Sequence, residues 1–222
     1  MGGYKDMKRY KHIVWDWNGT LMDDLCLCLN IVNKMLLCRG LDVVDRVRYR
    51  EVFGFPLRDY CIRIGFDLKR DPFERLSDEF NDMYEMRRCE CTLQEGVVDR
   101  LSELKNMGIQ HTLLSAYGQE RLVEIVEFYG LSSLFCEVWG LDNSYGEGKV
   151  ERGQRCMAEM DWQPSEILYV GDTLHDGEVA RAMGVDCVLV SHGHQNRQRL
   201  SQGVYPIADS LDEVRSYVVP DV

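Results

Sequence analysis

From Thr92 to the end of the chain, short apolar segments alternate with longer segments whose apolar residues recur at helical spacing. This alternation is typical of a parallel sheet with helices on both faces, so it limits the possible folds more than any other feature of the sequence. The expected strands are 111–115, a short segment around 138, 167–170 and 187–190, and the expected helices are about 97–107, 119–129, 150–160, one that ends at 183 and one that opens at 210–213.

The segment before Thr92 has a different organisation. Ile13–Asp16 is a short apolar run that ends on a carboxylate, which favours one more buried parallel strand. Residues 23–91 then contain helical patterns and no convincing strand. We therefore predict an α/β protein with two units: a Rossmann-like, doubly wound core made of residues 1–22 and 92–222, and an inserted all-helical domain made of residues 23–91.

Three of the expected strands end on side chains that are able to take part in chemistry. These side chains are Asp16, Ser115 and Asp172, and Asp176 follows the third of them by four residues. Lys149 lies at the start of the helix that precedes the strand leading to Asp172. In doubly wound sheets the ligand binds at the carboxyl ends of the strands, so we expect these residues to form one site.

The same residues carry a resemblance to a known family. The segments Asp16–Thr20, Ser115, Lys149 and Gly171–Asp176 resemble, in order and in separation, the four motifs of the haloacid dehalogenase superfamily. These motifs are D-x-D-G-[TV], a strand that ends in Ser or Thr, a Lys, and an acidic G-D-x-x-x-D. The resemblance covers nearly the whole chain. It implies a magnesium-dependent phosphohydrolase whose catalytic core carries the helical insert as a type-one cap, as in phosphoglycolate-phosphatase-like members.

The resemblance also implies a nucleophile and a metal site. Asp16 would attack phosphorus and form a transient aspartyl phosphate. The ligands of Mg²⁺ would be carboxylate oxygens of Asp16 and Asp172 and the backbone carbonyl of Asn18, with Asp176 supporting the ion directly or through water. Hard cations prefer such oxygen ligands.

Further residues would bind the phosphoryl group. By the same resemblance, Ser115 would donate a hydrogen bond to it and Lys149 would balance its charge and that of Asp16. Gly19 and Thr20 would shape the turn that lets backbone amides approach the phosphate, and Ala116 would line the substrate site.

One position departs from the family pattern. Asn18 stands where family phosphatases have the Asp that protonates the leaving alcohol and activates the hydrolytic water. An amide does not titrate near neutral pH, and general acid–base help is typically worth about 10²–10⁴-fold. Four explanations remain open: substrates with good leaving groups such as acyl or aryl phosphates, a proton relay by His175 or Asp23, a phosphonate hydrolase, and a slow, phosphate-binding or engineered trapping protein. The family's dehalogenases have a bulky aromatic residue here, so Asn argues against that activity.

The inserted domain contributes one more candidate. The segment 53–58 resembles the substrate-specificity loop of the cap, and Arg58 would pair with a substrate carboxylate. An arginine exposed at a helix start is an equally good explanation of this residue. We expect a small phosphomonoester as substrate, with phosphoglycolate as the best single candidate. A phosphosugar mutase fits less well, because a mutase depends on the acid that Asn18 lacks.

Composition limits the partners and the location. The net charge of the 222 residues is −11, which disfavours nucleic acid and anionic lipid as partners. The nine cysteines include no C-x-x-C pair, so reduced thiols are expected rather than disulfides or a zinc site. The N-terminus has no secretory pattern and no apolar run is long enough to span a membrane. We expect a cytoplasmic enzyme that acts on a small phosphorylated metabolite. Its oligomeric state is not predicted.

Four other residues stand near the motifs. Trp15 and Trp17 are interpreted as packing residues. His192 and His194 lack an evident third ligand and are not predicted to bind a metal.

Overall fold

The computed structural model describes residues 10–142, 145–146 and 148–218. Its larger unit is built on a six-stranded sheet with the strand order β5-β4-β1-β6-β7-β8, in which each neighbouring pair is parallel. The strands are β1 His12–Trp15, β4 Gln110–Gly118, β5 Glu137–Leu141, β6 Ile167–Gly171, β7 Asp186–Val190 and β8 Ile207–Ala208. The predicted α/β fold with a parallel, doubly wound sheet is therefore confirmed.

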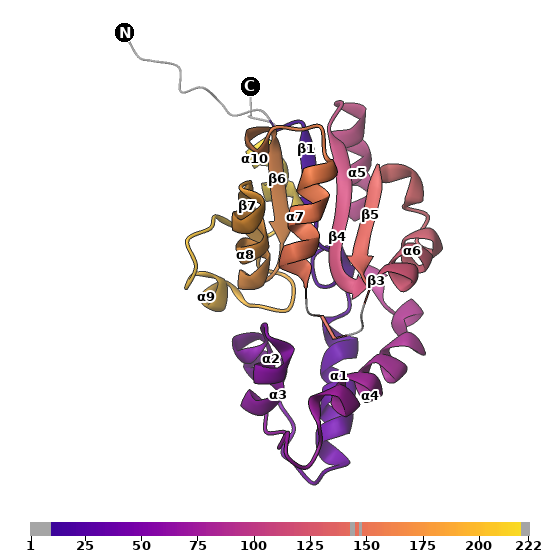
Figure 1. Ribbon diagram of the computed structural model, residues 1–222, viewed down its shortest axis with the longest axis vertical. Helices are drawn as coiled ribbons and strands as arrows, with labels where there is room; N and C mark the ends of the chain where they lie inside the picture. Colours follow the sequence, from indigo (N-terminus) through magenta and orange to yellow (C-terminus); the bar gives the residue numbers. More distant parts are fainter. Residues whose placement is uncertain (1–9, 143–144, 147, 219–222) are drawn as a thin grey trace.

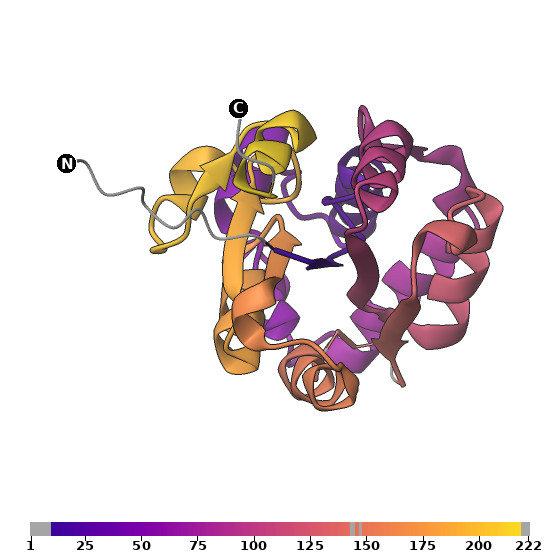
Figure 2. The same ribbon diagram turned by 90° about the horizontal axis from the view of Figure 1, so that it is seen from above.

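Helices cover both faces of this sheet (Figure 2). On one face, α5 Val97–Asn106, α6 Gln119–Phe128 and α10 Leu211–Val218 pack against the side chains of alternate strand residues. On the other face the covering helices are α7 Lys149–Glu159, α8 Leu174–Met183 and α9 Arg197–Leu200. Three short 3₁₀ helices, η1 Arg88–Glu90, η2 Ser132–Leu134 and η3 Pro164–Glu166, complete the connections.

The central strand β1 shows how the sheet is buried. Trp15 contributes to the core under α5, α6 and α10, whereas Val14 contributes to the opposite core under α7 and α8. Both side chains are fully buried, as is that of Trp17 just beyond the strand. The tryptophans are packing residues, as the sequence predicts.

The smaller unit consists of four helices at the end of the molecule that faces the strand termini (Figure 1). They are α1 Leu25–Leu37, α2 Arg46–Val52, α3 Leu57–Arg63 and α4 Phe73–Glu85, and they have a hydrophobic cluster of their own. The chain enters this cap through β2 Met22–Asp23 and leaves it through β3 Thr92–Leu93, and these two strands pair antiparallel. The two crossings therefore form a short ribbon between the units.

The strands β2, β3 and β8 are not among the predicted elements. Each has two residues, so a periodic pattern of apolar residues has no length over which to appear. They exist because partners distant in the sequence supply their hydrogen bonds. In the part of the chain that the structure describes, no helix is both long enough and apolar enough to cross a membrane.

Candidate active site

The carboxyl ends of β1, β4 and β6 bring the predicted motif residues together. Asp16 follows β1 directly, and its backbone N–H donates to the carbonyl of Val170 in β6 at 2.9 Å. Asp172 follows β6, and oxygens of Asp16, Asp172 and Asp176 lie within 4.8 Å of one another. All three carboxylates are buried.

Lys149 completes this centre from the first residue of α7. Its Nζ lies 2.6 Å from Oδ1 of Asp16 and 2.6 Å from Oδ1 of Asp176. The side chain is only 3 % exposed, so Lys149 is not a solvated surface lysine. Burial alone would lower the pKa of the ammonium, but the two carboxylates outweigh burial and hold the pKa well above its usual value. Lys149 therefore remains a cation.

Asp176 is held by the start of α8. Thr173 caps this helix, and its hydroxyl and backbone N–H donate to Oδ2 of Asp176 at 2.7 and 3.0 Å. Tyr169 donates its hydroxyl to Oδ1 at 3.2 Å. Burial opposes the charge of Asp176, yet Lys149 and these hydrogen bonds hold its pKa below the usual value. Asp176 is thus the best-compensated carboxylate of the three.

The other two carboxylates are poorly compensated. Burial raises the pKa of Asp16 to about 6 even with Lys149 beside it. Burial, together with the charges of Asp16 and Asp176, raises the pKa of Asp172 to about 8. One lysine therefore faces three buried carboxylates. A hard divalent cation bound by these oxygens would remove the excess of negative charge, so the residues present fit such an ion.

The turn after β1 explains Gly19 and Thr20. Gly19 has φ +76, and a Cβ at this position would lie 2.3 Å from Oδ2 of Asp172, so no other residue fits. The hydroxyl of Thr20 lies 3.3 Å from Asp16 Oδ2 and 3.2 Å from Asp172 Oδ1, so its one hydrogen is shared between the two carboxylates. This turn therefore positions the two carboxylates that flank it.

Ser115 and Ala116 line the same cavity from β4. The Ser115 side chain is buried, and its Oγ accepts a hydrogen bond from the backbone N–H of Tyr117 at 3.1 Å. The hydroxyl hydrogen of Ser115 is left to point at a ligand. The structure thus brings the predicted motif residues of the core into one site.

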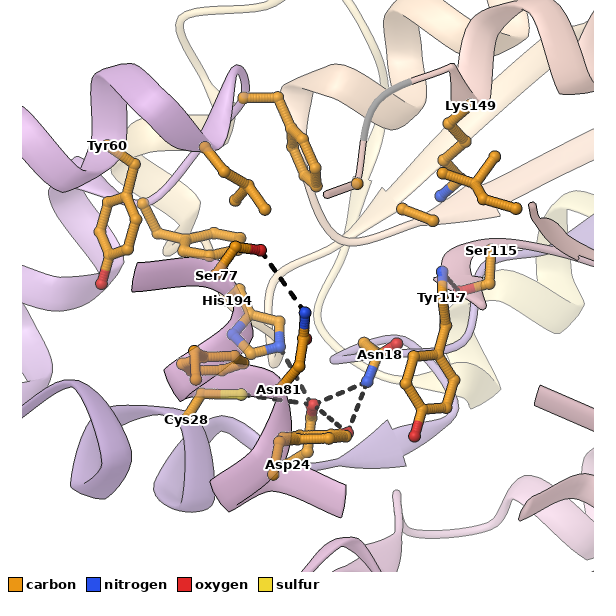
Figure 3. A pocket seen from close by; sticks show the side chains of 18 of the residues that line it. Asn18, Asp24, Cys28, Tyr60, Ser77, Asn81, Ser115, Tyr117, Lys149 and His194 are labelled. Carbon is orange, nitrogen blue, oxygen red and sulfur yellow. Dashed lines mark hydrogen bonds and ion pairs between the residues drawn. The ribbon is translucent and has the colours of Figure 1, made fainter. Parts of the chain in front are cut away.

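Asn18 is fixed by contacts that reach into the cap. Its Nδ2 donates to Oδ2 of Asp24 at 2.8 Å and to the hydroxyl oxygen of Tyr84 at 2.7 Å. Tyr84 in turn donates its hydroxyl to Asp24 Oδ2 at 2.8 Å, and Figure 3 shows Asn18 and Asp24 side by side. The amide is a hydrogen-bond donor locked to a carboxylate, not a group that supplies a proton.

The pair of Asp24 and His194 is not predicted from the sequence. Nε2 of His194 lies 3.0 Å from Asp24 Oδ1, and Nδ1 lies 3.0 Å from the hydroxyl of Tyr49. Burial alone would lower the pKa of His194, but Asp24 dominates and raises the pKa to about 9. The two residues are 170 positions apart, and no local pattern connects them. Cys28 also lies near this pair, but both ring nitrogens of His194 already have partners.

Three predicted candidates do not line the cavity. Arg58 pairs with Glu74 at 2.7 Å and covers the ring of Phe73 at 4.8 Å. His175, one of the two candidate proton relays, contacts Glu178 at 2.8 Å and stacks on Phe55, and Asp23, the other, is exposed in β2. The role of Arg58 in substrate binding stays a prediction, since this structure gives it no contact there.

Core and cap together line a cavity of about 640 Å³ that is partly open to solvent. Its floor contains the catalytic candidates of the core, including Asp16, Ser115, Lys149 and Asp172, and His194 lies beside them. Its roof is formed by side chains of α1–α4 and their connections. Figure 3 shows Tyr60, Ser77 and Asn81 of the cap on the side opposite Lys149 and Ser115.

Fold and site together define an α/β enzyme with a buried carboxylate–lysine centre at the carboxyl edge of its sheet. The family described as haloacid dehalogenase-like hydrolase matches residues 13–190, and the chain belongs to this family. The predicted family is thereby confirmed, and with it the prediction of a hydrolase. Family phosphatases generally use a divalent metal, in agreement with the acidic cluster.

The individual relatives have low sequence identity to this chain. The chain is 28% identical over 192 residues to the phosphoglycolate phosphatase of Synechococcus elongatus, covering 85% of this chain and 87% of that protein. It is 22% identical to the tyrosine-protein kinase PtkA of Mycobacterium tuberculosis, covering 91% of this chain and 70% of that protein. Among solved structures, a putative haloacid dehalogenase-like hydrolase from Bacteroides fragilis matches with a TM-score of 0.80 and 19% identity, covering 93% and 100% of the two chains.

Proposed function

We propose that the protein is a Mg²⁺-dependent phosphatase that hydrolyses a phosphomonoester through an aspartyl phosphate on Asp16. The observation that carries this proposal is the arrangement of Asp16, Asp172 and Asp176 within 4.8 Å of one another, with Nζ of Lys149 at 2.6 Å from the proposed nucleophile. Phosphoryl transfer asks for a positioned nucleophile and for neutralisation of the phosphoryl oxygens, and these residues supply both.

The metal would be held by carboxylate oxygens of Asp16 and Asp172 and by the backbone carbonyl of Asn18, with Asp176 in support. When bound, Mg²⁺ neutralises oxygens of the phosphoryl group. The fit rests on an all-oxygen donor set and on the excess of buried negative charge.

The protein groups have separate tasks. Lys149 holds Oδ1 of Asp16 at 2.6 Å, and Oδ2, whose contact with Thr20 is longer at 3.3 Å, would be the oxygen that attacks phosphorus while the ester P–O bond breaks. The hydroxyl of Ser115 and the ammonium of Lys149 bind phosphoryl oxygens as charge develops on them. A water molecule then attacks the phosphorus, the bond to Asp16 breaks, and both protons of the water leave on the product phosphate.

Asn18 limits the step in which the ester bond breaks, because the leaving group is not protonated there. Its amide donates to Asp24 and Tyr84, so it holds no proton that a leaving alkoxide could take. Asp24 is not a substitute, because its carboxylate already accepts hydrogen bonds from Asn18, Tyr84 and the backbone of Gly19. Alkyl esters are therefore expected to react slowly.

This deficit also supports a second candidate function. A protein with the complete phosphate site and no acid would bind phosphate esters without turning them over, as a binding or regulatory protein. Phosphoglycolate stays the substrate that the sequence resemblance predicts, and the relative in Synechococcus elongatus carries that name.

The test is phosphate release with and without Mg²⁺ from p-nitrophenyl phosphate, acetyl phosphate, phosphoglycolate and sugar phosphates. Asn18→Asp is assayed in parallel. Magnesium-dependent release by the natural sequence supports the phosphatase. Silence of the natural sequence together with activity of Asn18→Asp supports the binding protein, and silence of both refutes the assigned chemistry.

A further inference from the structure

The roof of the cavity carries no charge. The cap is described throughout, and none of its side chains that line the cavity between Cys28 and Tyr84 is acidic or basic. Most of them are aromatic or aliphatic, and the aromatic ones are Tyr49, Phe53, Phe55, Tyr60, Phe66, Phe73, Phe80 and Tyr84. The part of a substrate that lies beyond the phosphate therefore meets an apolar wall.

The cations that line the rest of the cavity already have acidic partners. Lys149 is paired with two carboxylates of the centre, and His194 is paired with Asp24. Arg121 lies 3.3 Å from Glu85. Each cation among the described residues of the lining therefore has an acidic partner, and none of these cations lies on the roof. A substrate carboxylate would be desolvated without a partner, which is costly.

The roof is also suited to a flat ring. Phe53 lies with its ring centroid 5.3 Å from that of Tyr49 and 5.1 Å from that of Tyr60. Phe80 and Tyr84 of α4 are stacked with centroids 5.9 Å apart. These contacts hold the rings in place, and because the rings line the cavity, their faces and edges would contact an aromatic ligand by stacking or in edge-to-face geometry. A cavity of about 640 Å³ is in the range that holds drug-sized ligands and exceeds the needs of a two-carbon acid.

Asn18 is an independent argument for the kind of bond that is broken. A phenol has a pKa of about 10, as in tyrosine, whereas the pKa of an alkyl alcohol is much higher and close to that of water. A phenolate therefore leaves without a proton, and an alkoxide does not. The site that lacks the acid is the same site whose roof is apolar and aromatic.

We propose that the substrate class of this enzyme is an aryl phosphate with an apolar body and no second charged group. The proposal rests on the phosphatase function proposed above and names its substrate. An oxygen of Asp16 forms the bond to phosphorus, the P–O bond to the aryl group breaks, and the phenolate leaves with the electron pair and takes a proton from solvent. Water then cleaves the aspartyl phosphate as described.

Four phosphate compounds distinguish the effect of the apolar roof from the effect of the leaving group. 1-Naphthyl phosphate has an aromatic body and a phenolic leaving group, whereas benzyl phosphate has an aromatic ring but an alkyl leaving group. Phosphoglycolate carries a second anionic group. Acetyl phosphate has no ring, and its leaving group needs no general acid. The quantity to compare is kcat/KM, because it reports the steps up to P–O cleavage and not the later hydrolysis of the phosphoenzyme. We expect 1-naphthyl phosphate to exceed benzyl phosphate by about 10²-fold or more and phosphoglycolate by at least as much.

Variants of the roof test the binding surface. Phe80→Ala should lower kcat/KM for 1-naphthyl phosphate by about tenfold, and clearly more than for acetyl phosphate, because one stacking surface is lost. Ile62→Ala is the matched control, since Ile62 is 55% exposed on the same cap and does not line the cavity. Ser77→Arg should place a cation at the roof and raise kcat/KM for phosphoglycolate relative to 1-naphthyl phosphate.

Failure of this proposal differs from failure of the phosphatase function. Turnover in which phosphoglycolate or benzyl phosphate equals or exceeds 1-naphthyl phosphate overturns the aryl class and leaves the phosphatase in place. An equal decrease of kcat/KM for 1-naphthyl phosphate and for acetyl phosphate in Phe80→Ala would also overturn the aryl class and leave the phosphatase in place. Absence of magnesium-dependent release from all four esters, also in Asn18→Asp, refutes the function itself.

Discussion

At the core end of the cavity one lysine lies beside a cluster of three buried carboxylates, whereas at the cap end the lining side chains from Cys28 to Tyr84 are uncharged and mostly aromatic or aliphatic. The core side chains are held by hydrogen bonds and ion pairs, such as the 2.6 Å contact between Lys149 and Asp16. The cap side chains are held by packing, such as the ring contacts of Phe53 with Tyr49 and Tyr60. One cavity thus combines two environments that would bind different parts of a ligand.

The difference indicates a division of tasks. A phosphoryl group carries the charge and the reacting bond, and the core end offers charge and fixed donors. The rest of a substrate is selected at the cap end, where burial of apolar surface contributes about 25 cal/mol per Å² and an unpaired charge is excluded. Changes at the core end should therefore alter chemistry for every ester, and changes at the cap end should alter the choice among esters.

The largest effect is expected at the nucleophile. Asp16→Asn should lower turnover by several orders of magnitude for all esters, because an amide oxygen does not form the aspartyl phosphate. Asp99→Asn is the matched control, since Asp99 is exposed on α5 of the core and outside the cavity. Phosphate release and the circular dichroism of both variants are measured. Activity retained by Asp16→Asn would assign the nucleophile elsewhere.

Lys149→Met should have the next largest effect, this time on stability. Removing the ammonium leaves two buried carboxylates without their partner, and breaking a buried pair costs about 3–5 kcal/mol. Lys11→Met is the control, because Lys11 makes a 2.6 Å pair with Glu166 while 54% exposed, and such pairs contribute about 1 kcal/mol or less. Urea unfolding in EDTA gives both values. Equal midpoints for the two variants would contradict a compensating role for Lys149.

Asn18→Asp should change chemistry at the core end without changing the roof. The new carboxyl would lie against Asp24, and two such groups together retain a proton because like charges raise the pKa of the pair. We expect kcat/KM for benzyl phosphate to rise by about 10–100-fold, with a smaller gain for 1-naphthyl phosphate. The ratio of the two esters is the measurement. A gain of equal size on both would mean that the acid is not what the natural site lacks.

The next effect is smaller and concerns how the free energy of unfolding depends on pH. The histidines responsible lie in the core, because the cap contains no histidine. Burial, with His111 nearby, lowers the pKa of His12 to about 4, and burial lowers that of His111 to about 4. Between pH 6.5 and 4 these histidines therefore bind more protons in the unfolded chain than in the folded protein. Their contribution to the free energy of unfolding is present above pH 6.5 and is lost as the pH falls through that window. Between pH 7 and 5.5 the loss is about 1 kcal/mol for each histidine.

The variant His12→Gln isolates this contribution. The difference in unfolding free energy between pH 7 and 5.5 should be about 1 kcal/mol smaller in the variant than in the natural protein. Urea titrations at the two pH values give both differences. The same pH dependence in both proteins would mean that His12 titrates normally in the fold.

The smallest effect is expected outside the cavity. Arg58→Ala should change KM for phosphoglycolate and for 1-naphthyl phosphate by less than about twofold, because its guanidinium is engaged with Glu74 on an exposed part of the cap. The measurement is KM for both esters in Arg58→Ala and in the natural protein. A large rise of KM for phosphoglycolate alone would establish the substrate contact that the sequence predicts for Arg58 and would show that the roof can acquire a cation.

The sequence by itself determined the framework of the protein. Apolar strands that end on Asp16, Ser115 and Asp172 are visible as short runs, and parallel strands place their carboxyl ends at one edge. The motif order identified the family, and Asn18 was recognisable as a departure. Each of these inferences depends on residues that are neighbours along the chain, where local periodicity and motif spacing carry the signal.

Only the tertiary structure decided what surrounds Asn18 and what forms the roof. Asp24 meets His194 across 170 residues, and Tyr84 meets Asn18 across 66. The roof is uncharged because of which side chains the cap turns inward, while charged residues such as Arg58 point elsewhere. Composition gives the charges of a segment but not their direction. That direction depends on how four short helices pack against each other and against the core, and packing is a property of contacts between distant residues.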